Sequence, residues 1–346
     1  MIGMCQLAAY IGDRPIAPLL MDALRFQEGY YGGQATGLGV LDNGVLSWVK
    51  QPGSVDHVIA NSNIMGLTGT TGIAHSRLKE TNVAEEYNRA RNAHPFTNTD
   101  NTIALMHNGV ITNYEQHWAE LAKEYTFKGY NEDINYITDS EVAVHMIDKL
   151  ISEGTCLEDA VRETANRLTG MVLLGVISVD EPETVYITNW IQACTLAVGD
   201  NETMFSSSPL GVQHVADEFN IFTAPRNSFI KMTREGFEIT RLDNNRKAPA
   251  TPIDWYGFRD EVIRILGECG KQNCLELHLK LEEAGGEKAF DISMGLWKEF
   301  QRMGWGDQNQ LIDTLNLMVE EGLINRTVEQ YPEGGVIVPR IFWSLP

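Results

Sequence analysis

The sequence is short of positive charge and has no long hydrophobic run. Its 346 residues include 27 Lys and Arg against 47 Asp and Glu, which gives a net charge of −20 at pH 7. This excess of acid argues against non-specific binding to nucleic acid or to an anionic membrane. No apolar run approaches the roughly 18 residues of a membrane-spanning helix, and the N-terminus lacks the features of a signal peptide. We therefore expect a cytoplasmic protein.

Cysteine is also scarce, and none of it forms a Cys-x-x-Cys pair. An odd number of cysteines in this arrangement predicts reduced thiols, with neither a disulfide framework nor a zinc site. The glycine-rich segment 29–37 is not a phosphate loop, because it has no GKS or GKT and no GxGxxG that opens a helix. The spacing of His75, His94 and His107 fits no common zinc pattern. We expect no metal and no cofactor. The five cysteines are Cys5, Cys156, Cys194, Cys269 and Cys274.

Hydrophobic periodicity and turn residues predict alternating strands and helices in the first part of the chain. Asn113 with Gln116, and Thr138 with Glu141, have the spacing of capping boxes at two helix starts. The expected strands are 7–11, 72–77 and 103–111, with a hairpin across the Asp42-Asn43-Gly44 turn. The expected helices run from Pro15 to Gly29, from Asn113 and from Thr138.

Cys5 is the candidate nucleophile. A cysteine at a true N-terminus can use its own α-amino group as the base, because the pKa of that amine is already near neutrality. This arrangement requires that Met1 to Met4 be absent from the working protein. Translation from Met4 followed by methionine removal would achieve it, and so would cleavage of a four-residue propeptide. The alternative is a buried, inert cysteine on a first strand.

Four sequence blocks follow Cys5 in a recognisable order: GIAHSR at 72–77, NAHPF at 92–96, HNGVITN at 107–113 and TDSEVAVHMI at 138–147. Together they resemble the glutaminase domain of class II glutamine amidotransferases, which are N-terminal-nucleophile hydrolases. The glucosamine-6-phosphate synthase type is the most similar. The resemblance covers residues 4–243. It implies an α+β fold, an αββα sandwich of two antiparallel sheets between helices.

The resemblance also implies a role for each matching residue. Cys5 would supply the thiolate and its α-amine the base. The Asn108 side chain and the Gly109 backbone N–H would bind the oxyanion, and glycine allows a close approach of the backbone to substrate. Arg77 would bind the carboxylate of glutamine, for which a guanidinium is suited because it binds in a bidentate manner. Asp139 would hold the ammonium group.

Departures from the family pattern concern the loop that closes over glutamine. Gln6 stands where the family usually has glycine, and Tyr31 stands where it has an arginine. Residues 78–81 replace an aromatic and small segment. These changes would weaken glutaminase activity or alter the amide accepted. His94 matches a family histidine near the site, and its role stays open, whereas we interpret His75 and His107 as core residues of strands.

The composition changes after a linker at 244–252. Segment 251–346 carries 9 basic and 16 acidic residues, and helices are expected at 255–267, 274–283, 292–303 and 308–321. Strands at 326–330 and 336–343 follow. Helices before a terminal hairpin indicate a winged-helix arrangement. Because 308–321 contains no Lys or Arg, a module for protein docking or dimerisation is favoured over one that reads a DNA groove.

These features predict a stand-alone glutaminase subunit that releases ammonia to a partner synthase. The length leaves no room for sugar-isomerase, phosphoribosyltransferase or ATP-dependent synthetase domains, so the ammonia acceptor is expected on another chain. A homo-oligomer is compatible with the sequence. Two alternatives stay open: a γ-glutamyl amide hydrolase that acts alone, since those enzymes also carry Met-Cys, a non-glycine next residue and HPF, and a non-catalytic regulator with Cys5 capped.

Overall fold

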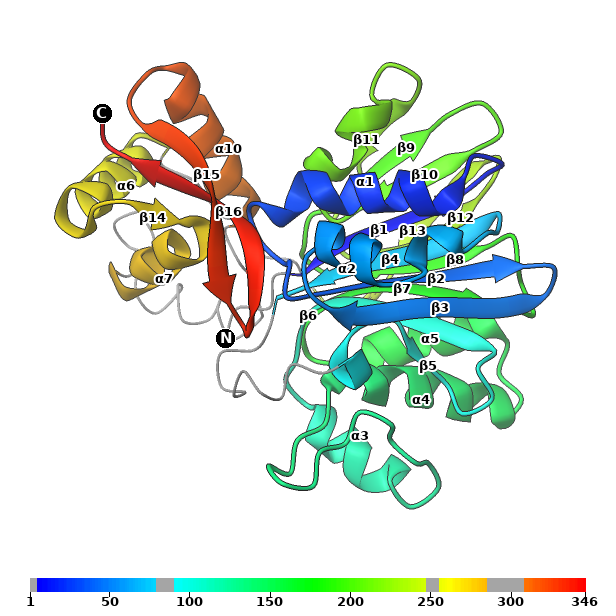
Figure 1. Cartoon of the computed structure of the whole chain (residues 1–346). Coiled ribbons are helices and arrows are strands. Elements are labelled where there is room, and N and C mark those ends of the chain that lie inside the picture. The colour runs from blue at the N-terminus through cyan, green and yellow to red at the C-terminus, as the bar shows by residue number, and fades with distance from the viewer. Residues whose placement is uncertain (1–4, 79–89, 247–254, 285–307) are drawn as a thin grey trace.

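The computed structural model describes residues 5–78, 90–246, 255–284 and 308–346. The described residues before the linker form two packed β-sheets with helices outside them, and those after it form a smaller unit at one side (Figure 1). The helix predicted at 292–303 lies outside the described residues.

Seven antiparallel strands form the first sheet, in the order β11-β9-β10-β1-β4-β2-β3. β1 lies at its centre, between β10 and β4. The predicted turn joins β2 to β3 with Asn43 and Gly44 both at positive φ, as a tight hairpin turn of this hand requires. The strands are β1 Gln6–Ile11, β2 Ala35–Asp42, β3 Val45–Pro52, β4 Thr71–Arg77, β9 Thr195–Val198, β10 Thr203–Ser206 and β11 Asn220–Thr223.

Six antiparallel strands form the second sheet, in the order β13-β12-β8-β7-β6-β5. The strand predicted at 103–111 is β6, which pairs with β7 along its whole length. The strands are β5 Phe96–Thr97, β6 Ile103–Ile111, β7 Gly170–Ser178, β8 Val185–Asn189, β12 Ser228–Thr233 and β13 Gly236–Arg241.

Helices cover the outer faces of the two sheets, so the layers run helix, sheet, sheet, helix (Figure 1). α1 and α2 pack on the first sheet, α4 and α5 pack on the second, and α3 lies beside α4. The fold is α+β. None of the described helices is long and apolar enough to cross a bilayer. The helices are α1 Ile16–Glu28, α2 Val55–Asn61, α3 Tyr114–Leu121, α4 Asp139–Ser152 and α5 Leu157–Arg167.

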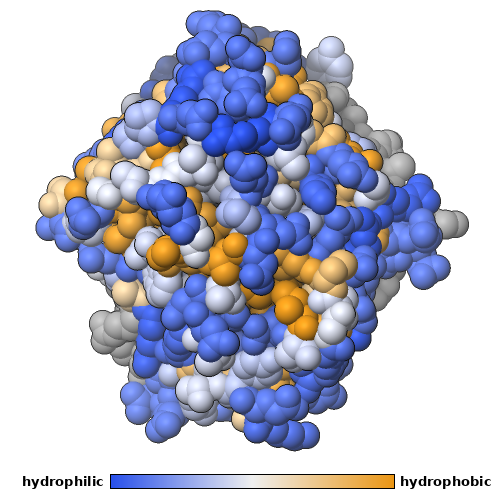
Figure 2. Space-filling model, turned by 90° about the vertical axis from the view of Figure 1, so that its right-hand side faces the viewer, coloured by the Kyte–Doolittle hydropathy of each residue, from blue (hydrophilic) through white to orange (hydrophobic). Residues whose placement is uncertain are grey.

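Strands of both sheets bury both of their faces. In β1, Leu7 and Ile11 face the second sheet, whereas Tyr10 packs under α1. In β6, Met106 faces the first sheet and Leu105 packs under α4. Alternate side chains of a strand point to opposite faces, so each central strand supplies two cores at once. On the side away from the C-terminal unit, the surface shows only a broken band of apolar residues among polar ones (Figure 2).

The two predicted capping boxes are wrong in their hydrogen bonds. Asn113 and Thr138 do precede α3 and α4, but neither side chain caps its helix. Asn113 instead bonds the backbone of residues 167–169. Glu141 accepts the backbone N–H groups of residues 128–129 at 2.6 and 2.8 Å. The side chains of Asn113 and Glu141 therefore bond backbone groups of neighbouring segments instead of capping their helices, because buried backbone groups require a hydrogen-bond partner.

The C-terminal unit consists of helices around a three-stranded sheet of order β14-β16-β15. Its hairpin of β15 and β16 packs against the end of α1 (Figure 1). Trp343 of β16 is fully buried and shares a hydrophobic cluster with Tyr30, which follows α1. The elements are α6 Trp255–Cys269, β14 Gln272–Asn273, α7 Cys274–Ala284, α10 Gln308–Glu320, β15 Asn325–Glu333 and β16 Val336–Ser344.

Glu28, the last residue of α1, places a carboxylate at the start of α2. The Val55 N–H donates to its two oxygens at 2.9 and 3.2 Å, and the Ser76 hydroxyl donates at 3.2 Å. A helix N-terminus favours negative charge. Burial nevertheless dominates and raises the pKa of Glu28 to about 7, although the Val55 N–H, the Arg340 charge and the Ser76 hydroxyl each lower it.

We expect Glu28 to make the protein less stable as the pH rises from about 4.5 to about 7. Its folded-state pKa of about 7 lies above its ordinary value of 4.5, so its contribution is fully present below pH 4.5 and is lost as the pH rises through 7. Glu28→Gln keeps the shape and has no titrating group. Urea unfolding between pH 5 and pH 8 should show wild type losing on the order of 3 kcal/mol relative to this variant. A constant difference would contradict the assignment.

Candidate active site

Cys5 and Arg77 lie at the same end of two neighbouring strands. Gln6 of β1 pairs with Ser76 of β4, so Cys5 and Arg77 are the next residues of the two strands. Ile73 of β4 faces the second sheet, and Arg77 shares its face because residues an even number apart do so. Cys5 is 8% exposed and Arg77 is 3% exposed. The two side chains therefore meet the inter-sheet layer at one end of the sandwich.

A hydrogen bond joins Cys5 to the other sheet. Its backbone nitrogen donates to Oδ1 of Asn108, in β6, at 3.2 Å. Because Oδ1 accepts this bond, Nδ2 is the group of this amide that can donate to a ligand. Gln192, between β8 and β9, donates its Nε2 to the Asn108 carbonyl at 2.7 Å. The side chain and the backbone of Asn108 are thus both held in place.

The Cys5 sulfur lies against the backbone of Leu78. The Leu78 N–H donates to Sγ at 3.4 Å, and Sγ lies 4.0 Å from the Leu78 carbonyl oxygen. The backbone of Leu78 thus presents both a donor and an acceptor to the sulfur. Since Leu78 directly follows Arg77, the same chain segment supports both the nucleophile and the guanidinium.

Gly109 is required by the fold. Its φ is +137°, and a Cβ at this position would lie 2.1 Å from the Met171 carbonyl oxygen of β7. Only glycine adopts this backbone conformation at low cost. The glycine that the sequence predicts for close approach to substrate is therefore also needed for close approach of two strands.

Asp139 begins α4 and reaches the end of β6. Its Oδ2 accepts the Ile111 N–H at 2.8 Å, its Oδ1 accepts the Ser140 hydroxyl at 3.0 Å, and His107 Nδ1 lies 3.6 Å from Oδ1. Burial opposes ionisation, but the charge and hydrogen bond of His107, with the Ile111 and Ser140 bonds, hold the pKa of Asp139 below its ordinary value. The group is a carboxylate at neutral pH. It contacts β6 at Ile111, a few residues after Asn108 in that strand.

His94 lies in a buried stack of rings. Its ring centroid is 3.8 Å from that of His75, and Phe96 packs edge-on at 4.8 Å. Burial lowers the pKa of both histidines, that of His75 to about 3, so both rings are neutral. His75 Nε2 and the His107 carbonyl oxygen are 3.0 Å apart, which adds a second link between the sheets. These stacked neutral rings supply no cation to a substrate.

The first sheet also holds the turn that carries His94. A Cβ on Gly37 would lie 1.8 Å from the His94 carbonyl oxygen. Lys50 donates its Nζ to the carbonyl oxygens of Ala93 and Pro95 at 2.8 and 2.9 Å. Gly37 is therefore needed because the NAHPF segment lies directly on β2.

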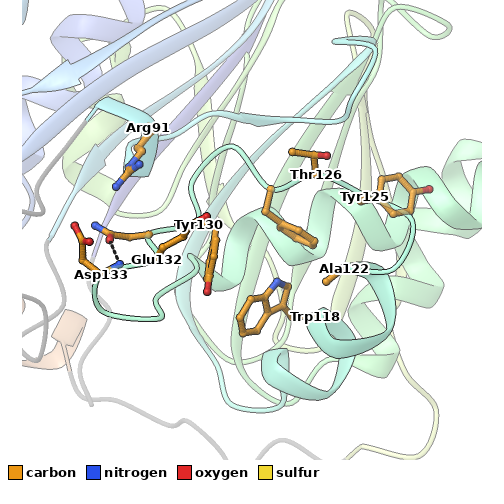
Figure 3. Close-up of a pocket in the computed structure, with 10 residues that line it drawn as sticks. Arg91, Trp118, Ala122, Tyr125, Thr126, Tyr130, Glu132 and Asp133 are labelled. Atoms are coloured by element: carbon orange, nitrogen blue, oxygen red, sulfur yellow. Dashed lines mark hydrogen bonds between the residues drawn. The ribbon is translucent and has the colours of Figure 1, made fainter.

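A pocket of about 710 Å³ lies elsewhere, between α3 and the segment that follows it (Figure 3). The rings of Trp118 and Tyr130 are 5.4 Å apart at its wall, and Arg91, Glu132 and Asp133 stand beside them. None of the residues that gather around Cys5 lines it. Across the described parts of the chain, no group of three or more His, Cys, Asp or Glu side chains could hold a metal ion.

The sequence did not indicate three contributors to this site. Gln192 holds the Asn108 carbonyl, Leu78 supplies an N–H to the sulfur, and His107 orients Asp139 through contacts that its assignment to the strand core did not include. Backbone donors leave no mark in a sequence. The position of His107 is a signal in the sequence, because it directly precedes the candidate oxyanion donors Asn108 and Gly109.

Comparison with known proteins bears on this arrangement. A family profile described as "Glutamine amidotransferase domain" matches residues 76–211, which include Arg77, Asn108, Gly109 and Asp139. The chain carries a class II glutamine amidotransferase domain. The profile begins after Cys5, so the placement of Cys5 beside Asn108 comes from the geometry.

Two relatives of this domain are named glutamine–fructose-6-phosphate aminotransferase (isomerizing). That of Chlorobaculum tepidum is 32% identical over 258 residues, which cover 73% of this chain and 40% of the relative. That of Mycobacterium bovis is 29% identical over 250 residues, which cover 70% of this chain and 38% of the relative. The chain thus spans about two fifths of the length of these relatives.

A solved structure shares the fold of the amidotransferase domain. The glutamine phosphoribosylpyrophosphate amidotransferase of Bacillus subtilis is similar with a TM-score of 0.59 and 17% identity. The likeness covers 74% of this chain and 52% of that one. It shows that the two chains share an α+β fold.

We expect Gly109→Ala to lower the free energy of unfolding by about 2–4 kcal/mol, from strain at positive φ and from the contact with the Met171 carbonyl. Gly236→Ala is the matched control, because Gly236 has a φ of +145° but nothing within 4 Å of its Cβ position. It should cost about 1–2 kcal/mol, from backbone strain alone. Equal losses in urea unfolding would show that the approach to Met171 does not matter.

Proposed function

We propose that the amidotransferase domain hydrolyses the side-chain amide of glutamine through a thioester on Cys5, and releases glutamate and ammonia. The observation that supports this most directly is the hydrogen bond between the Cys5 nitrogen and Asn108 Oδ1. Because the Cys5 nitrogen contacts the Asn108 amide directly, this bond supports the proposal that Cys5 supplies base and nucleophile and that Asn108 supplies an oxyanion donor. The role of base requires that residues 1–4 be removed, so that this nitrogen becomes an α-amine.

In the first half of the reaction, the α-amine takes the thiol proton and Sγ of Cys5 attacks the amide carbon. A carbon–sulfur bond forms, and negative charge develops on the former carbonyl oxygen. Asn108 Nδ2 and the Gly109 N–H donate to that oxygen, where a fixed donor stabilises the transition state more than the substrate. The carbon–nitrogen bond then breaks as the ammonium of Cys5 returns its proton to the leaving ammonia.

In the second half, a water molecule replaces ammonia. The α-amine takes a proton from this water as it attacks the thioester carbon. The same two donors hold the second oxyanion. The carbon–sulfur bond breaks, the proton returns to sulfur, and glutamate leaves with one oxygen from water.

Arg77 and Asp139 are proposed to bind the amino-acid end of glutamine. The Arg77 guanidinium would hold the carboxylate in a bidentate manner, and the Asp139 carboxylate would hold the ammonium. Charges of opposite sign at the ends of β4 and β6 match a zwitterion. His94 is proposed to line the site without binding charge, because its ring is neutral.

We propose two domains, 4–243 for amide hydrolysis and 251–346 as a winged-helix-like module. The order of the described elements, α6, the short strand β14, α7, α10 and a terminal hairpin, supports the second assignment. Segment 251–346 has 9 basic and 16 acidic residues, which favours docking to protein over DNA. The relatives are named aminotransferases, so the ammonia is proposed to pass to a synthase, on a partner chain or on a further domain.

The intact mass and the glutamine turnover of the purified protein test this function together. We expect loss of residues 1–4, and release of glutamate that Cys5→Ala lowers by about 10⁴-fold or more. Cys156→Ala, which removes an exposed thiol, should leave turnover unchanged. Retained residues 1–4 with full turnover would refute the α-amine as base.

A substrate panel separates the remaining alternatives. Preference for other γ-glutamyl amides over glutamine would indicate a hydrolase that acts alone. An absence of turnover on every amide, in protein whose Cys5 is N-terminal, would indicate a regulator that only binds.

We expect Asp139→Asn to raise KM for glutamine by about tenfold or more, because the ammonium loses a charged partner. The turnover number should change less, since Asp139 does not touch the reacting amide in this mechanism. Asp159→Asn is the matched control: Asp159 also lies in the first turn of a helix, α5, and its Oδ2 accepts from the Cys156 thiol, which is not one of the proposed site residues. If both variants raised KM equally, the effect would come from helix starts and not from binding.

A further inference from the structure

The C-terminal hairpin reaches back to a turn beside the active site. Residues 29–33 form this glycine turn, which follows α1. Arg340 of β16 donates Nη1 to the Glu28 carbonyl at 2.8 Å and Nη2 to the Gly32 carbonyl at 2.6 Å. The neighbouring Ile341 N–H donates to the first carbonyl of the turn at 2.9 Å. One guanidinium thus bridges the two ends of the glycine turn.

The charge of Arg340 is almost fully buried, since the residue is 2% exposed. Its Nε donates to Glu333 Oε2, on the facing strand β15, at 2.6 Å. A buried guanidinium is costly unless its donors are paired. Because these partners come from the hairpin and from the glycine turn, the hairpin is bound in one orientation.

The other side of the glycine turn lies against the end of β4. The Gly33 N–H donates to Ser76 Oγ at 2.8 Å, and the Gln34 N–H donates to the Arg77 carbonyl at 3.1 Å. A Cβ on Gly33 would lie 2.9 Å from Val338 of β16. The turn is therefore held between the hairpin and the two residues that end β4.

We propose that Arg340 is a positioning residue for the glutamine site. It holds the glycine turn against β4 and thereby sets the place of Arg77. The inference rests on the function proposed above, in which Arg77 binds the carboxylate of glutamine. It makes the C-terminal unit a part of the site, so a partner that displaced the hairpin would change the affinity for glutamine.

The test is glutamine kinetics of full-length Arg340→Gln, with active sites counted by a glutamine analogue that alkylates Cys5. We expect KM to rise about tenfold or more, because charged hydrogen bonds to two carbonyls are lost. The turnover number per active site should fall by a smaller factor than KM rises, because the Leu78 N–H beside the sulfur follows Arg77 but Cys5 is also held by Asn108, and the oxyanion donors lie on β6. A loss of active sites with unchanged KM would mark a merely structural role and overturn the proposal.

Two further variants make the test specific. Arg340→Lys keeps the charge and can donate to both carbonyls, so it should recover part of the affinity. Arg264→Gln is the matched control, because Arg264 lies in the same unit but bonds Glu261 and Glu268 of its own helix, α6. An equal rise in KM for Arg264→Gln would overturn the proposal.

Amide hydrogen exchange separates this inference from the proposed function. The Gly33 and Gln34 amides, which bond Ser76 and Arg77, should exchange about tenfold faster or more in Arg340→Gln, and unchanged exchange would overturn the proposal. If wild type turned over no glutamine, the function would fail. The exchange rates would then still decide whether Arg340 positions the end of β4.

Discussion

The hydrogen bond from the Cys5 nitrogen to Asn108 Oδ1 is the contact on which the site depends, because it joins the ends of two separate sheets. Each sheet must present the correct residue at that point. A slip of one residue in β1 or β6 would turn every side chain of the strand to its other face, so that Leu7 or Met106 would leave the layer between the sheets. The packing that makes the sandwich stable therefore also sets the register of the site, and no separate device is needed to align nucleophile and oxyanion donor.

The sequence predicted the parts of this arrangement that local patterns encode. The strand 103–111 and the hairpin turn at 42–44 follow from apolar periodicity and turn chemistry, and the structure confirms both. The site residues could be selected because they stand in four short blocks with a fixed order. The prediction of capping boxes was wrong because it used local spacing alone. Thr138 and Glu141 have the spacing of a capping box, but the Glu141 carboxylate accepts backbone N–H groups of residues 128–129.

The unpredicted parts are those in which distant segments meet. Arg340 and Gly32 are 308 positions apart, and nothing near either residue indicates the other. Nothing in the sequence around Glu28 indicates that this carboxylate at a helix end is buried and bonded to the start of α2. The sequence excludes a phosphate loop for the glycine-rich segment 29–37, and the resemblance aligns Tyr31 with a family arginine, but neither indicates which residues pack against the segment. Its small residues are explained by backbones and side chains that press on it from two sides.

This compression bears on how a site at the end of a sandwich can be regulated. The layer between the two sheets is a packed hydrophobic core, and moving its side chains would expose apolar surface. We therefore expect regulation to act at the ends of the strands. β4 ends at Arg77, and the glycine turn is bonded to that end on one side and to a buried cation on the other. Gly32 and Gly33 of this turn adopt positive φ, which glycine does at low cost, whereas a buried guanidinium has few orientations that satisfy its donors. The glycine turn is thus held in place by a buried cation, and through it the C-terminal unit is linked to Arg77 and to the Leu78 N–H that contacts the Cys5 sulfur.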